Sequence, residues 1–219
     1  DGFRCDVAGF VPTEFWNTAI TTLRAANGPL FMLAEWEDPA LVEAGFNAVY
    51  GWEFHHIMNE IAQGHKNVSA VAEYAAKCDT LWPSETMKMY FNTNHDENSW
   101  NGTEYEKYGV TAKAWAVFTA TWGGLPLVYS GQEIPNHKRL SFFEKDELAW
   151  LLQTKQPALH GFYKSLLSLR TQNDAVVFGQ NQMLQTSYPN SIIGFIKKHQ
   201  NNVVLVLLNI SEHNRLAFE

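Results

Sequence analysis

The alternation of short apolar strands with helical segments is the feature that most constrains the fold of this 219-residue chain. The pattern predicts an apolar strand at residues 3–8, a helix at 14–26 and a second strand at 30–35. Strand, helix, strand is the unit that builds parallel sheets. Three more strands follow with helices between them, at 45–51, 89–96 and 125–129. We therefore expect an α/β fold with five parallel strands.

The helical segments are recognised by apolar residues at helical spacing and by their start and stop signals. Thr13 is the expected N-cap of the helix at 14–26. Gly123-Gly124 should end a long helix that begins at residue 105. Further helices are predicted at 54–63, 68–77, 147–153 and 159–170, and a short helical turn at 39–44.

The pattern changes at Asp174, after which strands follow one another without helices. They are predicted at 182–187, 191–198 and 203–210, and turn-forming residues join them. Strands connected by short turns pair in an antiparallel sheet. We therefore divide the chain into two parts, 1–173 and 174–219.

Three of the predicted parallel strands end in a carboxylate. Asp6 lies two residues after Arg4 in the first strand, so both side chains point the same way and form a facing pair. Glu35 ends the second strand beside Trp36, and Asp96 ends the strand at 89–96. In a parallel barrel such strand ends converge on the face where active sites are built. Taken alone, Arg4 and Asp6 could equally be a structural ion pair.

The chain resembles the α-amylase family of retaining glycoside hydrolases through three motifs and the stretch 124–133 that follows them. In chain order the motifs are Gly2-Phe3-Arg4-x-Asp6-x-Ala8, Ala34-Glu35-Trp36 and Asn94-His95-Asp96. The resemblance implies a (β/α)8 TIM barrel followed by an antiparallel β-sandwich domain.

A complete barrel takes about 250 residues, which is more than this chain contains. We therefore expect a C-terminal portion of a longer protein, with barrel strands four to eight in residues 1–173. Residues 174–219 are expected to be the start of the β-sandwich domain. The N-terminal half of the barrel is expected to be needed for function.

Retaining hydrolysis of a glycosidic bond needs an ionised carboxylate as nucleophile and a second carboxyl group as proton donor. Asp6 beside the Arg4 cation fits the nucleophile, and Glu35 in a less polar setting fits the donor. Asp96 is left to hydrogen-bond sugar hydroxyls and to favour the distorted ring of the transition state. The resemblance implies the same three catalytic roles. It also implies that Arg4 orients the nucleophile and that His95 binds the sugar.

Other acids and histidines compete for these roles. Glu37 and Asp38 could replace Glu35 as the acid, but they fall beyond the strand end, where a loop holds groups less firmly. Glu133 could line the site, although we favour a structural role for it. One short stretch resembles a loose metal cluster, formed by Glu53, His55, His56 and Glu60. The spacing of these residues matches no tight ligand motif, so we favour hydrogen bonding at a helix start.

The expected function is that of an α-glucan hydrolase of α-amylase type, acting on α-1,4 bonds in starch or maltooligosaccharides. A glucanotransferase of the same family is the alternative. A non-catalytic carbohydrate-binding homologue is disfavoured because all three acids are present. Trp36, one of eight tryptophans, is expected to bind the substrate by stacking on a sugar face.

Charge and hydropathy restrict the partners. The net charge is −7, and the clustered basic residues that nucleic-acid binding requires are missing, so a nucleic-acid partner is not expected. A membrane partner is not expected either, since no apolar run reaches membrane-spanning length. The resemblance implies a secreted, periplasmic or cell-surface protein.

The chain departs from the family pattern at a position that is linked to calcium binding. Many α-amylases carry Lys-His where this chain has Gly9-Phe10, and in that family the pair helps to bind calcium. A calcium site at this position is therefore disfavoured, and we expect any calcium ligands mainly in the N-terminal part of the barrel. We expect no metal ligand among the site residues. Cys5 and Cys78 are predicted to be free.

Overall fold

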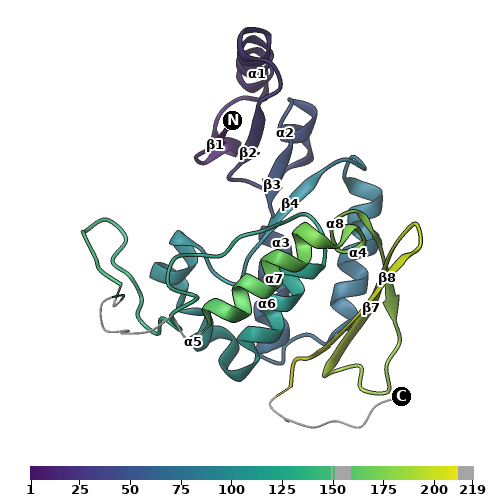
Figure 1. The fold of residues 1–219 in the computed structure, drawn as a ribbon. Coiled ribbons are helices and arrows are strands. Elements are labelled where there is room, and N and C mark those ends of the chain that lie inside the picture. The colour runs from purple at the N-terminus through teal and green to yellow at the C-terminus, as the bar shows by residue number, and fades with distance from the viewer. Residues whose placement is uncertain (149, 151–158, 212–219) are drawn as a thin grey trace.

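The computed structural model describes residues 1–148, 150 and 159–211, which form two β-sheets with helices packed around them (Figure 1). The first sheet has five parallel strands in sequence order, as predicted. They are β1 (Gly2–Cys5), β2 (Phe31–Ala34), β3 (Ala48–Tyr50), β4 (Met87–Tyr90) and β5 (Leu125–Pro126). In the described part of the chain, β1 and β5 each have one neighbouring strand, so the sheet is open at both edges.

Helices connect the parallel strands, as the alternation predicted. They are α1 (Thr13–Asn27), α2 (Pro39–Glu43), α3 (Trp52–Ala62), α4 (Ser69–Leu81), α5 (Glu104–Tyr108) and α6 (Ala112–Thr121). Two further helices, α7 (His160–Gln172) and α8 (Asp174–Phe178), follow β5. Three short helical turns accompany them, namely η1 (Ala8–Phe10), the π-helical η2 (Glu97–Asn101) and η3 (Gly109–Thr111). None of the helices in the described ranges is both long enough and apolar enough to cross a membrane.

The second sheet is antiparallel, as predicted, and consists of β6 (Gln180–Leu184), β7 (Ile192–His199) and β8 (Asn202–Asn209). The short helix α8, which the sequence did not predict, precedes this sheet at the expected change of pattern. The division at residue 174 stays a prediction.

Several predicted boundaries were wrong. The first strand ends at Cys5, because Val7 adopts a left-handed conformation with φ of 38°, so Asp6 lies in the turn after the strand. Thr13 is the first residue of α1 and does not cap it through its side chain. The strand predicted at 89–96 ends at Tyr90, and residues 95 and 96 begin a helical segment.

The long helix predicted at 105–122 is two helices. Thr103 and Glu106 form a capping box that starts α5, and Gly109 with φ of 51° separates α5 from the turn that leads into α6. The helix predicted at 147–153 falls largely outside the described residues.

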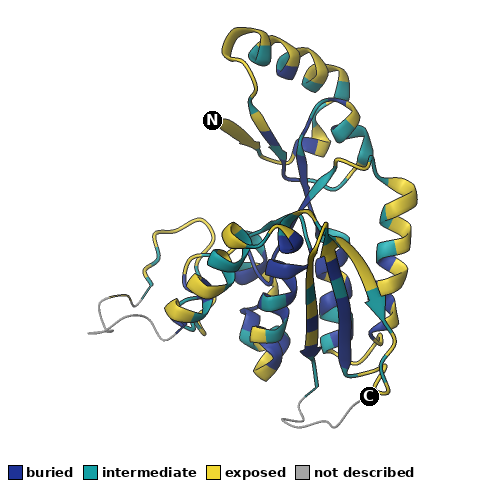
Figure 2. Ribbon diagram, turned by 45° about the vertical axis from the view of Figure 1, so that its right-hand side comes forward, coloured by how far each residue is buried: buried dark blue, intermediate teal, exposed yellow. Residues whose placement is uncertain are grey.

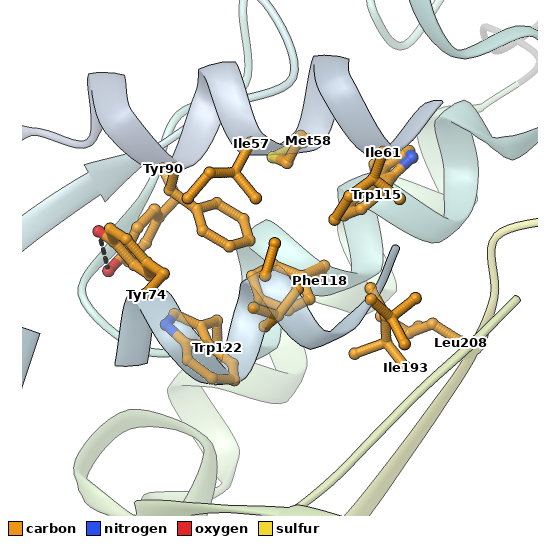
Figure 3. Close-up of a cluster of buried hydrophobic side chains, with 14 of the residues drawn as sticks. Ile57, Met58, Ile61, Tyr74, Tyr90, Trp115, Phe118, Trp122, Ile193 and Leu208 are labelled. Atoms are coloured by element: carbon orange, nitrogen blue, oxygen red, sulfur yellow. Dashed lines mark hydrogen bonds between the residues drawn. The ribbon is translucent and has the colours of Figure 1, made fainter. Parts of the chain in front are cut away.

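The largest core cluster joins the helices to the second sheet (Figure 3). Phe54 of α3 stacks on Phe118 of α6 with ring centroids 4.6 Å apart, and Phe118 meets Phe195 of β7 at 5.8 Å. Ile193 of β7 and Leu208 of β8 belong to the same cluster. The second sheet is therefore packed against the helices that follow the parallel strands, and shares one core with them.

Side chains from the second sheet and from α7 also cap the C-terminal end of α6. Lys197 Nζ on β7 donates to the Trp122 carbonyl oxygen at 2.9 Å, and Asn181 Nδ2 on β6 donates to the same oxygen at 2.8 Å. Arg170 of α7 donates to two further carbonyls around this helix end. Cations suit a helix C-terminus, where carbonyl groups are unpaired and the dipole is negative. Burial lowers the pKa of Lys197 to about 8.

A smaller cluster lies between the sheet and the first two helices. Ile20 of α1 and Leu41 of α2 cover Met32, Ala34 and Val49 of the strands. Figure 1 shows β1, α1, β2 and α2 together at one end of the molecule, apart from α5 to α7.

Candidate active site

The residues predicted from the strand ends lie together around the Arg4 guanidinium. Arg4 Nη1 donates to Asp6 Oδ1 at 2.7 Å, and Arg4 Nη2 donates to Glu35 Oε1. His95 Nε2 lies 3.3 Å from Arg4 Nη2 and 3.2 Å from Glu35 Oε1. Asp96 Oδ2 is 3.8 Å from the same histidine nitrogen. Three segments that are far apart in the sequence thus contribute to one cluster.

The pairing of β1 with β2 sets the positions of Asp6 and Glu35. Cys5 is the register partner of Ala34, so the residues that follow them leave the sheet at the same level. The backbone amide of Glu35 donates to the Cys5 carbonyl at 3.0 Å. In return, the amide of Val7 donates to Glu35 Oε2 at 3.1 Å. The tight turn after β1 therefore fixes both the nucleophile candidate and the acid candidate.

Asn94 holds His95 and Asp96 in place. Its side chain is fully buried, and Oδ1 accepts hydrogen bonds from the amides of Asp96 at 3.0 Å and Glu97 at 2.8 Å. These bonds satisfy free amides at the start of the helical segment, as an N-cap does.

Behind this segment lies a buried ionic group that the sequence reasoning missed. Glu97 Oε2 is 2.8 Å from His55 Nε2 and 2.8 Å from Lys107 Nζ, and all three side chains are buried. His55 Nδ1 lies 3.1 Å from the Phe91 carbonyl oxygen. Burial alone would raise the pKa of Glu97, but hydrogen bonding to His55 and Lys107 keeps that pKa well below its usual range. The segment that carries Asp96 is thus anchored in the interior.

Tyr50, at the end of β3, is another residue that sequence reasoning missed. Its hydroxyl group lies 3.5 Å from Arg4 Nε, and its ring lies beneath the guanidinium with the Arg4 Cζ atom 5.9 Å from the ring centroid. Strand β3 contributes this contact from the position between β2 and β4. Tyr50 therefore helps to fix the arginine around which the acids gather.

The two central carboxyl groups are in opposite electrostatic environments. The hydrogen bond from Arg4 lowers the pKa of Asp6, whose side chain is 74% exposed. Burial raises the pKa of Glu35, which is only 5% exposed, although the Val7 amide and the Arg4 charge oppose this shift. One group is therefore held as a carboxylate and the other is biased towards the acid. Pairs of acids with separated pKa values can divide the roles of nucleophile and proton donor.

The competing acids have structural partners. Glu37 Oε1 accepts from Lys88 Nζ at 2.7 Å in a buried pair. Asp38 caps α2 by accepting from the Ala40 amide at 2.9 Å. Glu133 lies outside the cluster and accepts from the Gly131 amide, two residues earlier, at 3.1 Å.

The loose group of acids and histidines on α3 does not converge. His55 points to Glu97, whereas Glu53 pairs with Lys77 at 2.7 Å and Glu60 lies 3.6 Å from His65. Within the described ranges, the group of side chains whose geometry could suit a metal ion is Glu35, His95 and Asp96. The Arg4 guanidinium contacts two of these three, and calcium requires six to eight oxygen ligands. This group therefore does not fit calcium.

Trp36 lies against the turn after β1 and beside a cavity. Its ring centroid is 5.0 Å from that of Phe10, and a Cβ atom at Gly9 would overlap the ring. Glycine at this position therefore permits the close approach of Trp36. The cavity has a volume of about 530 Å³ and is lined by Trp36, Trp52 and His56 among others. Cys5 and Cys78 are both free, as predicted.

No family model matches the chain. The chain is 24% identical over 217 residues to an α-amylase from Haloarcula japonica, covering 95% of the chain and 31% of that relative. It is 23% identical over 236 residues to a cyclomaltodextrinase from Thermoanaerobacter pseudethanolicus, covering 100% of the chain and 38% of that relative. The chain thus spans about a third of the length of these curated relatives.

Solved structures of α-amylases have a similar fold. A maltogenic α-amylase from Thermotoga neapolitana superposes with a TM-score of 0.84 at 26% identity, covering 96% of this chain and 48% of the other. An α-amylase from Lactobacillus plantarum gives a TM-score of 0.82 at 20% identity, covering 97% of this chain and 52% of the other.

The fold is therefore a partial (β/α)8 barrel of the glycoside hydrolase type with part of a β domain after it. The resemblance to the α-amylase family, predicted from the three motifs, is confirmed.

Proposed function

We propose that the protein is a retaining α-glucan hydrolase of α-amylase type that cleaves α-1,4-glucosidic bonds in starch or maltooligosaccharides. The observation that supports this most directly is the pair Asp6 and Glu35, gathered at one arginine with pKa values shifted in opposite directions. The names of the relatives, which include cyclomaltodextrinase, neopullulanase and maltogenic α-amylase, support an α-glucan substrate.

The proposed reaction has two displacements. The Asp6 carboxylate attacks the anomeric carbon while the Glu35 carboxyl group gives its proton to the departing glycosidic oxygen, which leaves a glycosyl ester on Asp6. Glu35, now a carboxylate, takes a proton from water, whose oxygen attacks the same carbon and releases Asp6. The sugar leaves with its original configuration, and both side chains regain their starting protonation.

The other residues of the cluster position the glucosyl ring and the nucleophile. Arg4 holds Asp6 through the 2.7 Å hydrogen bond and keeps it ionised. His95 and Asp96 are proposed to hydrogen-bond sugar hydroxyls, and the Asp96 carboxylate to stabilise the distorted, positively charged ring. The exposure of Asp6 is consistent with a nucleophile that must meet an incoming sugar.

Isosteric amides at the two acids test the proposal. Asp6→Asn should reduce starch hydrolysis to near background, and Glu35→Gln should reduce kcat by about a hundredfold or more. An aryl maltoside with a good leaving group needs less proton donation, so it should restore turnover in Glu35→Gln but not in Asp6→Asn. Glu43→Gln, which changes an exposed carboxyl group on α2, serves as the control. Wild-type turnover in either amide variant would remove that residue from its role.

Transfer to a sugar acceptor is a second candidate, and the cavity beside Trp36 favours it. This cavity of about 530 Å³ adjoins the residue after Glu35, and its two tryptophans could stack an acceptor sugar. Transfer would use the same two acids, with a sugar hydroxyl in place of water. Measuring the release of reducing sugar against the redistribution of chain lengths separates the two activities.

A further inference from the structure

Three large aromatic side chains lie exposed next to the candidate active site. The exposed fraction is 58% for Trp100, 36% for Phe142 and 82% for Phe143. Ring centroids are 5.0 Å apart for Trp100 and Phe142 and 4.6 Å apart for Phe142 and Phe143. We call these three residues the aromatic platform. They form a continuous apolar surface that described residues of the chain leave largely uncovered.

The aromatic platform is continuous with the catalytic cluster. The ring of Phe142 stacks on the His95 imidazole, with an interplanar angle of 22° and a centroid separation of 6.3 Å. His95 in turn lies 3.2 Å from Glu35. Trp100 belongs to η2, the turn that directly follows Asp96. A glucan that places one glucosyl unit at His95 would therefore reach the aromatic platform with its next unit.

Hydrogen bonds hold the two segments of the platform together. Asn98, in the same turn as Trp100, accepts from the Leu140 amide at 2.8 Å through Oδ1. Asp146 accepts from the Ser141 amide at 2.9 Å and also pairs with Lys138. The loop that carries Phe142 and Phe143 is thus fixed against the turn, and the aromatic surface is already formed.

The chemistry of this surface suits a neutral sugar chain. Contiguous exposed apolar surface on a soluble protein is a candidate binding surface for a ligand or a partner. Nearby cations are neutralised, since Arg139 pairs with Glu106 at 2.9 Å and Lys138 with Asp146. A surface that stacked nucleic-acid bases would need free basic groups beside the rings. A sugar presents an apolar C–H face to an aromatic ring and needs no charge.

We propose that Trp100, Phe142 and Phe143 form a stacking platform for the glucosyl residues that neighbour the one held by His95 and Asp96. This inference rests on the proposed function and narrows it, because the preferred substrate becomes an α-glucan of several units. The platform contributes to binding and to the choice of chain length, and takes no part in bond cleavage.

Binding of maltooligosaccharides of increasing length tests the platform. The measurement uses an Asp6→Asn background, which prevents turnover. Titration calorimetry should give a dissociation constant for maltohexaose that is about 3- to 10-fold larger in Phe143→Ala and in Trp100→Ala. The constant for maltose should change by less than that for maltohexaose. Phe143→Tyr, which keeps the ring, should restore binding. Phe178→Ala removes a ring that is 66% exposed on α8 and serves as the control.

Three results would overturn the platform. One is unchanged maltohexaose affinity in both alanine variants. Another is equal loss for maltose and maltohexaose in Phe143→Ala. The third is that the platform variants change the oligomeric state in sedimentation while glucan affinity stays the same, which would assign this surface to a second copy of the chain. Binding is measured without turnover. The dependence of the dissociation constant on glucan length can therefore be measured even if the hydrolase proposal fails.

Discussion

The region around β1 and α1 and the region formed by α3, α5 and α6 both position residues of the candidate active site, but they bury their side chains very differently. Residues 2–4 of β1 are exposed, and Ile20 is the buried residue of α1. Helix α6, by contrast, buries most of its side chains, including Trp115 and Phe118 (Figure 2). Arg4 and Asp6 therefore stand on the exposed region, whereas the buried region anchors His95 and Asp96.

This difference shows that two kinds of interaction hold one site. The pairing of β1 with β2 and the ionic contacts of Arg4 fix Asp6. Buried partners that extend into the core fix Asp96. We expect the free energy of unfolding to depend mainly on the second region and the pH dependence of catalysis mainly on the first.

The largest expected effect comes from emptying the core of the buried region. Trp115 is fully buried, and Trp115→Ala should lower the free energy of unfolding by about 3–5 kcal/mol because it leaves a large cavity. In the exposed region, Phe15→Ala on α1 should change the free energy of unfolding by less than about 0.5 kcal/mol, since Phe15 is 55% exposed. Urea denaturation measures both. Equal losses would show that the two regions contribute alike to stability.

The next effect concerns the ionic group behind Asp96. Glu97→Gln leaves the Lys107 ammonium group buried without its carboxylate and should cost about 3–5 kcal/mol of stability. Glu53→Gln is a matched control on the same helix as His55, because it breaks the exposed pair with Lys77 and should have little effect.

The pH dependence of this loss gives a second readout. The folded-state pKa of Glu97 is lowered, so its contribution is present above the ordinary carboxyl pKa and is lost as the pH falls. The stability difference between wild type and Glu97→Gln should therefore shrink on acidification. A difference that grows as the pH falls would contradict an ionised Glu97.

The smallest effect is a shift in the pH profile of catalysis. Arg4 lowers the pKa of Asp6, and its charge also lowers that of Glu35 against the larger effect of burial. Arg4→Gln should therefore raise both pKa values and move both limbs of the bell-shaped kcat/KM profile to higher pH. Lys164→Gln, which removes an exposed charge on α7, is the control. A profile that stays in place or moves to lower pH would show that Arg4 does not lower the pKa values of Asp6 and Glu35.

Much of the fold and of the site follows from local pattern. The order of the parallel strands, the antiparallel second sheet and the convergence of Asp6, Glu35 and Asp96 were predicted, because alternation and strand ends are readable along the chain. The capping box at Thr103 was also readable and would have placed the start of α5, whereas Gly109 divides the helix predicted at 105–122.

The remaining features depend on contacts between distant residues. The group of His55, Glu97 and Lys107 brings together residues separated by up to 52 positions, and nothing in their local spacing predicts it. The exposure of Phe142 and Phe143 likewise depends on how the loop after β5 lies against η2. Val7 ends β1 through a left-handed conformation. This conformation is uncommon for a β-branched residue, so a valine at this position does not indicate a turn.

The capping of α6 by Lys197 and Asn181 has a consequence for protein engineering. A helix of the barrel obtains its terminal hydrogen bonds from strands that come later in the chain, so the two parts cannot be exchanged as independent modules. A chimera that joined this barrel segment to the β domain of a relative would need an amine and an amide at the positions of Lys197 and Asn181. Without them the Trp122 carbonyl would lose both of these donors.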